Sequence, residues 1–255
     1  MNIWIKRAYA SLVFAFLYLP LVVIAVYSFN ASKFSLAWKG FTLRWYDKLL
    51  HNATLVDAAF RSMTIAVVSA TISCLIGTLA AFMLHQYRIK GRRAVFASIF
   101  VMMMTPDIVI GISLLVLFLG LGLSLGFWTL LMGHVTLCVP FVAATVYSRF
   151  KGFDPRVVEA ARDLGAVEYQ VFRRIVLPMA APGLVAGWLL SFTMSLDDVI
   201  VSFFTTGPTY EVLPLRIYSM VRLGIKPDVN ALSVLMIIIT VAAVLLSRRL
   251  LKEKS

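Results

Sequence analysis

Three acidic residues lie within strongly apolar stretches of this 255-residue sequence: Asp107 in MTPDIVIG, and the adjacent Asp197 and Asp198 in SLDDVI. An ionised carboxylate at the centre of a bilayer costs about 2.5 to 3.5 kcal/mol even on the mildest insertion scale, so such acids are typical of substrate or ion pathways. The same stretches contain no Lys or Arg. Water, protons, backbone donors or a cationic cargo must therefore accompany the acids, and we interpret all three as candidate substrate-path residues.

Each acid also has a structural alternative. Thr105-Pro106 precedes Asp107, and because proline removes a backbone donor and interrupts helices, Asp107 can instead cap a helix that begins again or lie at the interface. Asp197 and Asp198 can form an external-interface pair if their span ends near Leu196. Nearby aromatic residues would add cation–π contacts to a cationic cargo, or serve only packing. They are Trp128, Phe203, Phe204 and Tyr210.

The elements that must position these acids are apolar helices. Hydrophobic residues make up 61% of the chain and charged residues 14%, whereas soluble domains carry about 25% charged residues. A membrane span needs roughly 17 to 25 mainly apolar residues. The sequence therefore predicts an all-α membrane protein with a single permease domain over residues 1–255. The six expected spans are 8–29, 63–84, 94–119, 127–147, 180–204 and 231–247.

Basic residues predict the orientation of these spans. An even number of spans puts both termini on one side, and Lys and Arg favour that side by about two to one, which predicts cytoplasmic termini. The first span follows Lys6 and Arg7 and is too long for a secretory signal core, so we expect it to be retained. The net charge of +12 is spread in clusters beside apolar runs, which argues against nucleic-acid binding.

Other reactive residue types carry no site of their own. Cys74 and Cys138 lie in apolar runs, where we expect free, structural thiols. The three histidines, His51, His85 and His134, lack metal-ligand spacing, so no bound metal or cofactor is expected.

Small residues recur every four positions in the fifth expected span, before the Asp197-Asp198 pair. Such a stripe favours close packing against another helix, and helical geometry places Asp198 within its arc and Asp197 beside it. The helix-packing residues are Gly183, Gly187, Ser191 and Ser195.

The fourth and fifth spans are joined by a charged segment, residues 154–178, which we call the coupling segment. Asp154-Pro155 is typical of a helix start, and Gly165 of a helix end. A second helical run is expected over 167–176, so the segment forms two short helices with a glycine elbow. The first helix has one apolar side, made by Val157, Val158, Ala161 and Leu164.

Two surfaces could receive the coupling segment. An amphipathic helix can rest on lipid, but the segment carries four acids, and its Ala160-Ala161 pair is small. Small residues among charges favour insertion into a groove of a partner protein.

The coupling segment resembles the coupling loop of bacterial ABC-importer permeases. The pattern is Glu-Ala-Ala, three residues, Gly, nine residues and Ile-x-Leu-Pro, and this chain matches all seven defined positions. The resemblance implies docking into a cleft on a separate ATP-hydrolysing subunit. The chain itself has no G-x-x-x-x-G-K-[ST] phosphate loop, so we do not expect it to be an enzyme. We expect its partner subunit to bind ATP and Mg and to hydrolyse the ATP. The matching residues are Glu159, Ala160, Ala161, Gly165, Ile175, Leu177 and Pro178.

Most of the chain is also similar to spermidine/putrescine permeases of the PotC type. This resemblance implies the ABC importer type I (MetI-like) fold in a bacterial inner membrane. It also implies import of polyamines delivered by an extracytoplasmic binding protein, and pairing with a second, related permease over an ATPase dimer. The stretches that carry it are FTLRWYDKLL, MTPDIVIGISLLVLF, YSRFKGFDPRVVEAARDLGA, SLDDVIVSFFTTGPTYEVLP and NALS.

Two alternatives remain at this point. One is a self-sufficient channel or proton-coupled secondary transporter that uses the three acids as a proton relay. Single-chain carriers usually contain two related halves, and no repeat is visible here. The other alternative is an ABC permease for a different solute.

Overall fold

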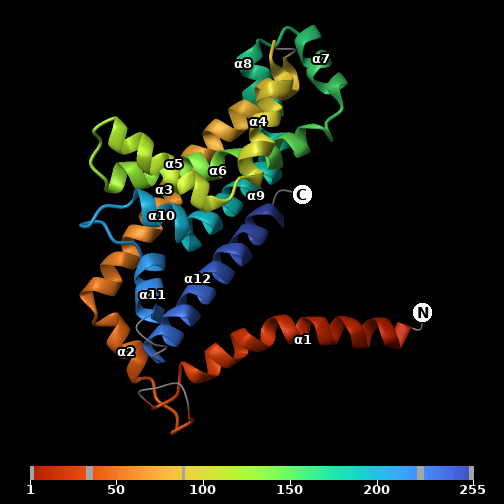
Figure 1. Cartoon of the computed structure of the whole chain (residues 1–255). Coiled ribbons are helices and arrows are strands. Elements are labelled where there is room, and N and C mark those ends of the chain that lie inside the picture. The colour runs from red at the N-terminus through yellow and green to blue at the C-terminus, as the bar shows by residue number, and fades with distance from the viewer. Residues whose placement is uncertain (1–2, 33–36, 88–89, 223–226, 253–255) are drawn as a thin grey trace. The chain divides into compact units, whose positions relative to one another are not determined.

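The computed structural model describes residues 3–32, 37–87, 90–222 and 227–252, and it is almost entirely helical (Figure 1). Over these residues the structure has one isolated β-bridge, between Asn30 and Phe41. The chain separates into two compact units, Met1–Ala59 with Arg216–Ala243 and Phe60–Leu215 with Val244–Ser255. The expectation of a single permease domain stays a prediction.

The first unit is organised around the buried side chain of Asn30. It contains α1 (Ile3–Tyr27) and α2 (Arg44–Leu50), the start of α3 (Ala53–Gln86), and much of α11 (Leu213–Arg222) and α12 (Pro227–Lys252). Asn30 Oδ1 accepts hydrogen bonds from the backbone N–H groups of Ser32 and Lys39, at 3.2 and 2.9 Å. The Trp45 indole donates to the Asn30 carbonyl at 2.7 Å. One asparagine thus satisfies the backbone of the loop after α1 and attaches it to α2.

The second unit holds the three candidate substrate-path acids and the coupling segment. It comprises most of α3, then α4 (Arg92–Met104), α5 (Asp107–Gly120), α6 (Phe127–Phe150), α7 (Pro155–Asp163), α8 (Glu168–Val171), the π-helical turn η1 (Phe172–Val176), α9 (Leu177–Asp197) and α10 (Ile200–Thr205). Helix α6 packs against α9, α4 and α10, and α10 packs against α5. A buried cluster that includes Leu84, Val146, Phe150 and Val176 joins α3, α6 and the base of the coupling segment.

Four helical segments in the described chain are long and apolar enough to cross a membrane, namely Ile3–Tyr27, Ala53–Gln86, Phe127–Phe150 and Glu168–Asp197. Helices α4 and α5 add a fifth if the bent pair counts as one span. The apolar part of α12, Asp228–Ala242, is shorter. The all-helical, multi-span prediction is confirmed, whereas the count of six stays a prediction.

Two expected spans differ from the structure. The stretch 94–119 is not one straight helix, because α4 and α5 meet at Thr105-Pro106 with a bend of 108°. Proline lacks the N–H that would continue the ladder, and Thr105 is extended, with ψ 130°. The expected span 180–204 does not coincide with a single helix. Its helix runs unbroken from Glu168 to Asp197, and Asp198 is extended before α10 begins.

Candidate functional site

The three candidate substrate-path acids lie in different environments. Asp107 is the first residue of α5, and Asp197 is the last residue of α9; both side chains are exposed. Asp198 is 8% exposed and lies between α9 and α10. Helix α10 follows the Asp197-Asp198 junction and packs against α5, the helix that begins at Asp107.

The Asp198 carboxylate binds backbone donors of the next helix. Its Oδ1 accepts the Val201 N–H at 3.2 Å, and its Oδ2 accepts the Ser202 N–H at 2.7 Å. His134 Nε2 lies 3.6 Å from the same Oδ2. Asp198 therefore has partners within this chain, and it stabilises the start of α10, as aspartates do at helix N-termini. Backbone donors are one of the partners that the sequence left open for these acids, and α6 adds a histidine beside Asp198.

His134 is the residue that joins these helices. It is 2% exposed; its Nδ1 is 2.6 Å from Ser195 Oγ, and its Nε2 is 2.9 Å from Ser202 Oγ. Ser69 of α3 donates to Ser195 Oγ at 3.0 Å. We call Ser69, His134, Ser195, Asp198 and Ser202 the elbow network. The sequence predicted no specific role for His134. An imidazole within an apolar run is costly unless it has polar partners, and this cost is the sequence feature that could have indicated its role.

The small-residue stripe of α9 faces α6 along its length, and all four of its members are buried. A Cβ on Gly183 would lie 2.9 Å from Arg149 Cβ, and one on Gly187 would lie 3.3 Å from Val142 Cγ1. The Cys138 thiol donates to the Ser191 carbonyl at 3.6 Å. The fourth member, Ser195, belongs to the elbow network. Small side chains thus allow α9 to approach α6 closely, up to the junction that holds the acids.

Replacing Gly187 by leucine is expected to destabilise the protein by about 1–3 kcal/mol, because the added atoms force α6 and α9 apart. The measurement is Tm of the solubilised protein together with its abundance in membranes. Ala186→Leu is the matched control, since Ala186 is on the same helix but exposed. Equal Tm values for the two variants would contradict close packing at the stripe.

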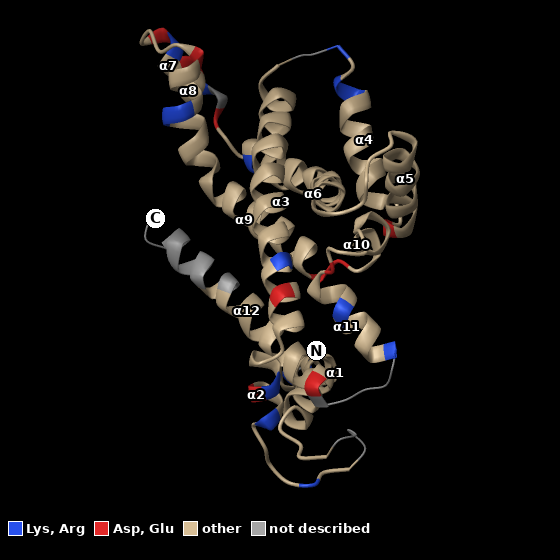
Figure 2. Cartoon of the chain, turned by 90° about the vertical axis from the view of Figure 1, so that its left-hand side faces the viewer, with Lys and Arg blue, Asp and Glu red and all other residues tan. Residues whose placement is uncertain are grey.

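The coupling segment forms the first of the two short helices expected, α7. Asp154 Oδ1 accepts the Arg156 N–H at 3.0 Å and so caps α7. Gly165, with φ +82°, ends that helix in the left-handed region. The second helix differs from the expectation, because α8 continues through η1 into α9 without a break. Motion of this segment would therefore reach α9 directly. Figure 2 shows that acidic and basic residues gather on α7 and α8.

An ion pair joins α7 to α8 across the turn at Gly165. Arg162 Nη2 donates to both carboxylate oxygens of Glu168, each at 3.0 Å. Tyr87, just beyond α3, donates its hydroxyl to Glu168 Oε1 at 3.2 Å. Desolvation and the Glu168 carboxylate raise the pKa of Tyr87. Glu168 thus connects the coupling segment to the end of α3.

The apolar side expected on α7 is divided between the core and the surface. Val158 and Ala161 pack against the cluster at the base of the segment, whereas Leu164 is 89% exposed. Leu164 lies outward because the chain turns at Gly165, which has φ +82°. Two further apolar side chains at this tip, Val167 and Tyr169, are also exposed.

Five of the seven residues that match the importer pattern are exposed, and the other two are half-buried. Glu159 and Ala160 are exposed on α7, and Gly165 is exposed at the turn between α7 and α8. Ala161 is half-buried. Where the segment joins α9, Ile175 is half-buried and Leu177 and Pro178 are exposed.

The helical membrane fold with this segment between two apolar helices defines a permease of binding-protein-dependent importers. The chain belongs to the family described as binding-protein-dependent transport system inner membrane component, whose model matches residues 73–252. It is 51% identical over 251 residues to the spermidine/putrescine transport system permease protein PotC of Escherichia coli (strain K12), covering 98% of this chain and 95% of that one.

Two further comparisons agree with this family. The putrescine transport system permease protein PotI of the same strain is 40% identical over 232 residues, which cover 88% of this chain and 82% of PotI. A chain from the crystal structure of a bacterial ABC transporter involved in the import of the acidic polysaccharide alginate has the same fold. It superposes with a TM-score of 0.74 at 18% identity, over 98% of this chain and 94% of that one.

Proposed function

We propose that this chain is the permease subunit of an ATP-driven importer of the polyamines spermidine and putrescine. The observation that carries the proposal is 51% identity to a spermidine/putrescine permease over nearly the whole length of both chains. The chemistry agrees, because polyamines are multiply charged cations. Exposed carboxylates such as Asp107 and Asp197 would stabilise them along an apolar passage, where charge–charge attraction is stronger than in water.

Within this proposal the two acids of the junction have different roles. Asp197 is exposed and would meet the cargo, whereas Asp198 holds the junction in shape through α10 and His134. Asp107, at the bend between α4 and α5, would be a second point along the path. Helices broken within the membrane are where transporters place substrate sites, and both positions are helix breaks in this chain.

The proposal includes partners that act on the coupling segment. A dimer of ATP-binding subunits would receive α7 and the exposed Leu164, since large exposed apolar side chains on a charged surface are typical of interaction sites. ATP binding would move the segment, and the unbroken helix from Glu168 to Asp197 would carry that motion to the acids. The spans would then open alternately to the two sides. The chain would need no cofactor, because ATP and Mg would be used by the partner.

The remaining parts of the proposal concern the membrane. The chain would be a single permease domain in the bacterial inner membrane, with six spans, both termini and the coupling segment in the cytoplasm. It would pair with a second, related permease and receive its cargo from an extracytoplasmic polyamine-binding protein.

Uptake of radiolabelled spermidine and putrescine by the complete transporter in proteoliposomes tests this function. We expect accumulation that requires ATP, the binding protein and the ATP-binding subunit, and a control without that subunit should give background uptake. Uptake that persists without the subunit and collapses with the proton gradient would instead identify a secondary transporter. ATP hydrolysis stimulated by an inorganic anion, with no polyamine uptake, would identify a permease for another solute.

A further inference from the structure

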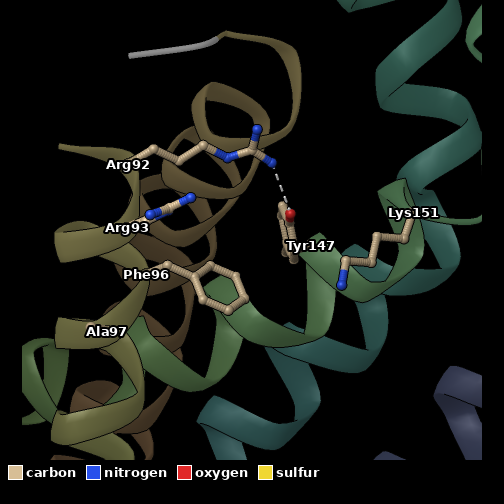
Figure 3. A pocket seen from close by; sticks show the side chains of 6 residues that line it. All are labelled: Arg92, Arg93, Phe96, Ala97, Tyr147 and Lys151. Carbon is tan, nitrogen blue, oxygen red and sulfur yellow. Dashed lines mark hydrogen bonds between the residues drawn. The ribbon is translucent and has the colours of Figure 1, made fainter. Parts of the chain in front are cut away.

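A basic pocket lies between α4 and α6. It has a volume of about 460 Å³. Arg92 and Lys151 approach from the two helices with Tyr147 between them (Figure 3). Arg92 Nη2 donates to Tyr147 Oη at 3.1 Å, and Lys151 Nζ lies 5.2 Å from the centre of the Tyr147 ring. The lining residues are Arg92, Arg93, Phe96, Ala97, Tyr147 and Lys151.

The charges of this pocket favour the binding of an anion. Three of its six lining side chains are cationic and none is acidic. Like charges held close together repel one another, and an anion in the pocket would remove that repulsion. Guanidinium groups match phosphate oxygens in geometry, and an ammonium group adds a point charge. The polar part of the pocket therefore fits a phosphate group.

An apolar pocket adjoins the basic one. It has a volume of about 110 Å³, and it shares Phe96, Tyr147 and Lys151 with the basic pocket. Its other lining residues are Leu84 of α3, Ile99 and Phe100 of α4, and Ala143, Ala144 and Ser148 of α6.

The outer face of α4 continues this apolar character. Phe100 is 45% exposed, Val101 64% and Met104 83%. A free inorganic anion would gain no binding free energy from contact with this apolar surface. The combination of a cationic pocket with an adjoining apolar surface fits a molecule that has an anionic head and a hydrocarbon chain.

We propose that this pocket binds the phosphate headgroup of an anionic phospholipid, with an acyl chain along the apolar surface between α4 and α6. Basic pockets between membrane helices bind such headgroups, especially on the cytoplasmic side. The bound lipid would offset part of the positive charge of Arg92, Arg93 and Lys151 and hold α4 against α6. The inference goes beyond polyamine import and does not depend on the cargo.

The test is lipid binding by the assembled transporter after delipidation, measured by native mass spectrometry. The probes are phosphatidylglycerol, phosphatidylcholine, glycerol 3-phosphate and inorganic phosphate. We expect the wild type to bind phosphatidylglycerol about tenfold or more tightly than phosphatidylcholine. The variant Arg93→Gln/Lys151→Gln should lose most of this preference, because each basic residue near a membrane surface attracts anionic lipid appreciably.

A matched variant, Lys6→Gln/Arg7→Gln, removes the same charge from the first turns of α1 and should keep the preference. An equal loss in both variants would overturn the proposal, as would equal binding of the two lipids by the wild type. Complete competition by glycerol 3-phosphate or inorganic phosphate would show a soluble-anion site and overturn the lipid assignment. The readout contains no polyamine, so failure of the proposed function leaves it unaffected. Tm of each variant checks folding.

Discussion

Asp197→Asn is expected to reduce polyamine uptake tenfold or more while leaving Tm unchanged. The Asp197 side chain is exposed at the end of α9, so its loss removes a negative charge from the proposed path without breaking the elbow network. A tenfold loss corresponds to about 1.4 kcal/mol, well within the attraction between a carboxylate and an ammonium group at reduced dielectric. KM for spermidine should rise, and Asp197→Glu should restore much of the uptake.

Asp198→Asn should reduce uptake by a different route. An amide offers one acceptor oxygen where the carboxylate accepts two N–H groups, and leaving a buried donor without a partner costs about 1–3 kcal/mol. Tm and membrane abundance should therefore fall together with uptake. His134→Ala should reproduce this pattern, since it removes the partner of Ser195 and Ser202. If instead Asp198→Asn abolishes uptake at unchanged Tm while Asp197→Asn transports normally, Asp198 is the acid that meets the cargo.

Gly165→Val is expected to uncouple ATP hydrolysis from uptake. Gly165 has φ +82°, a region that costs an ordinary residue about 1–2 kcal/mol and a β-branched residue more. A Cβ here would meet no neighbouring atom within 4 Å, so the effect comes from the backbone and not from a clash. Relief of the strain would turn α7 away from α8. Uptake should drop about tenfold or more while the complex still assembles and hydrolyses ATP.

Two variants sharpen this experiment. Gly152→Ala is the control, because a Cβ there meets only the Arg149 carbonyl at 3.5 Å, and its uptake should match the wild type. Glu159→Gln changes an exposed side chain of α7 and should also weaken coupling without lowering Tm. Normal uptake by both Gly165→Val and Glu159→Gln would show that the coupling assignment is wrong.

Local features of the fold followed from the residue pattern. Apolar runs predicted the membrane helices, Asp154-Pro155 predicted the start of α7, and Gly165 predicted its end. Each depends on neighbours in sequence, through side-chain caps, backbone dihedrals and helical period. The proline at position 106 marked a break for the same reason, although the 108° bend that results depends on what α4 and α5 pack against.

The candidate acids show what could not be predicted. Asp197 and Asp198 are adjacent and chemically identical, and helical geometry placed both near the stripe of α9. Only the tertiary structure separates them, because the helix ends at Asp197 and His134, far away in sequence, lies beside Asp198. Burial and pairing are long-range properties, and no local pattern encodes them.

The sequence by itself determined that this chain is an all-helical membrane permease, since composition, apolar length and the coupling pattern are properties of the residues in order. The tertiary structure decided which acid is exposed, how α6 and α9 join through the elbow network, and that Arg92, Arg93 and Lys151 share one pocket. The physical reason is the same in each case. These arrangements depend on contacts between helices that are distant in sequence, and such contacts exist only once the helices have packed.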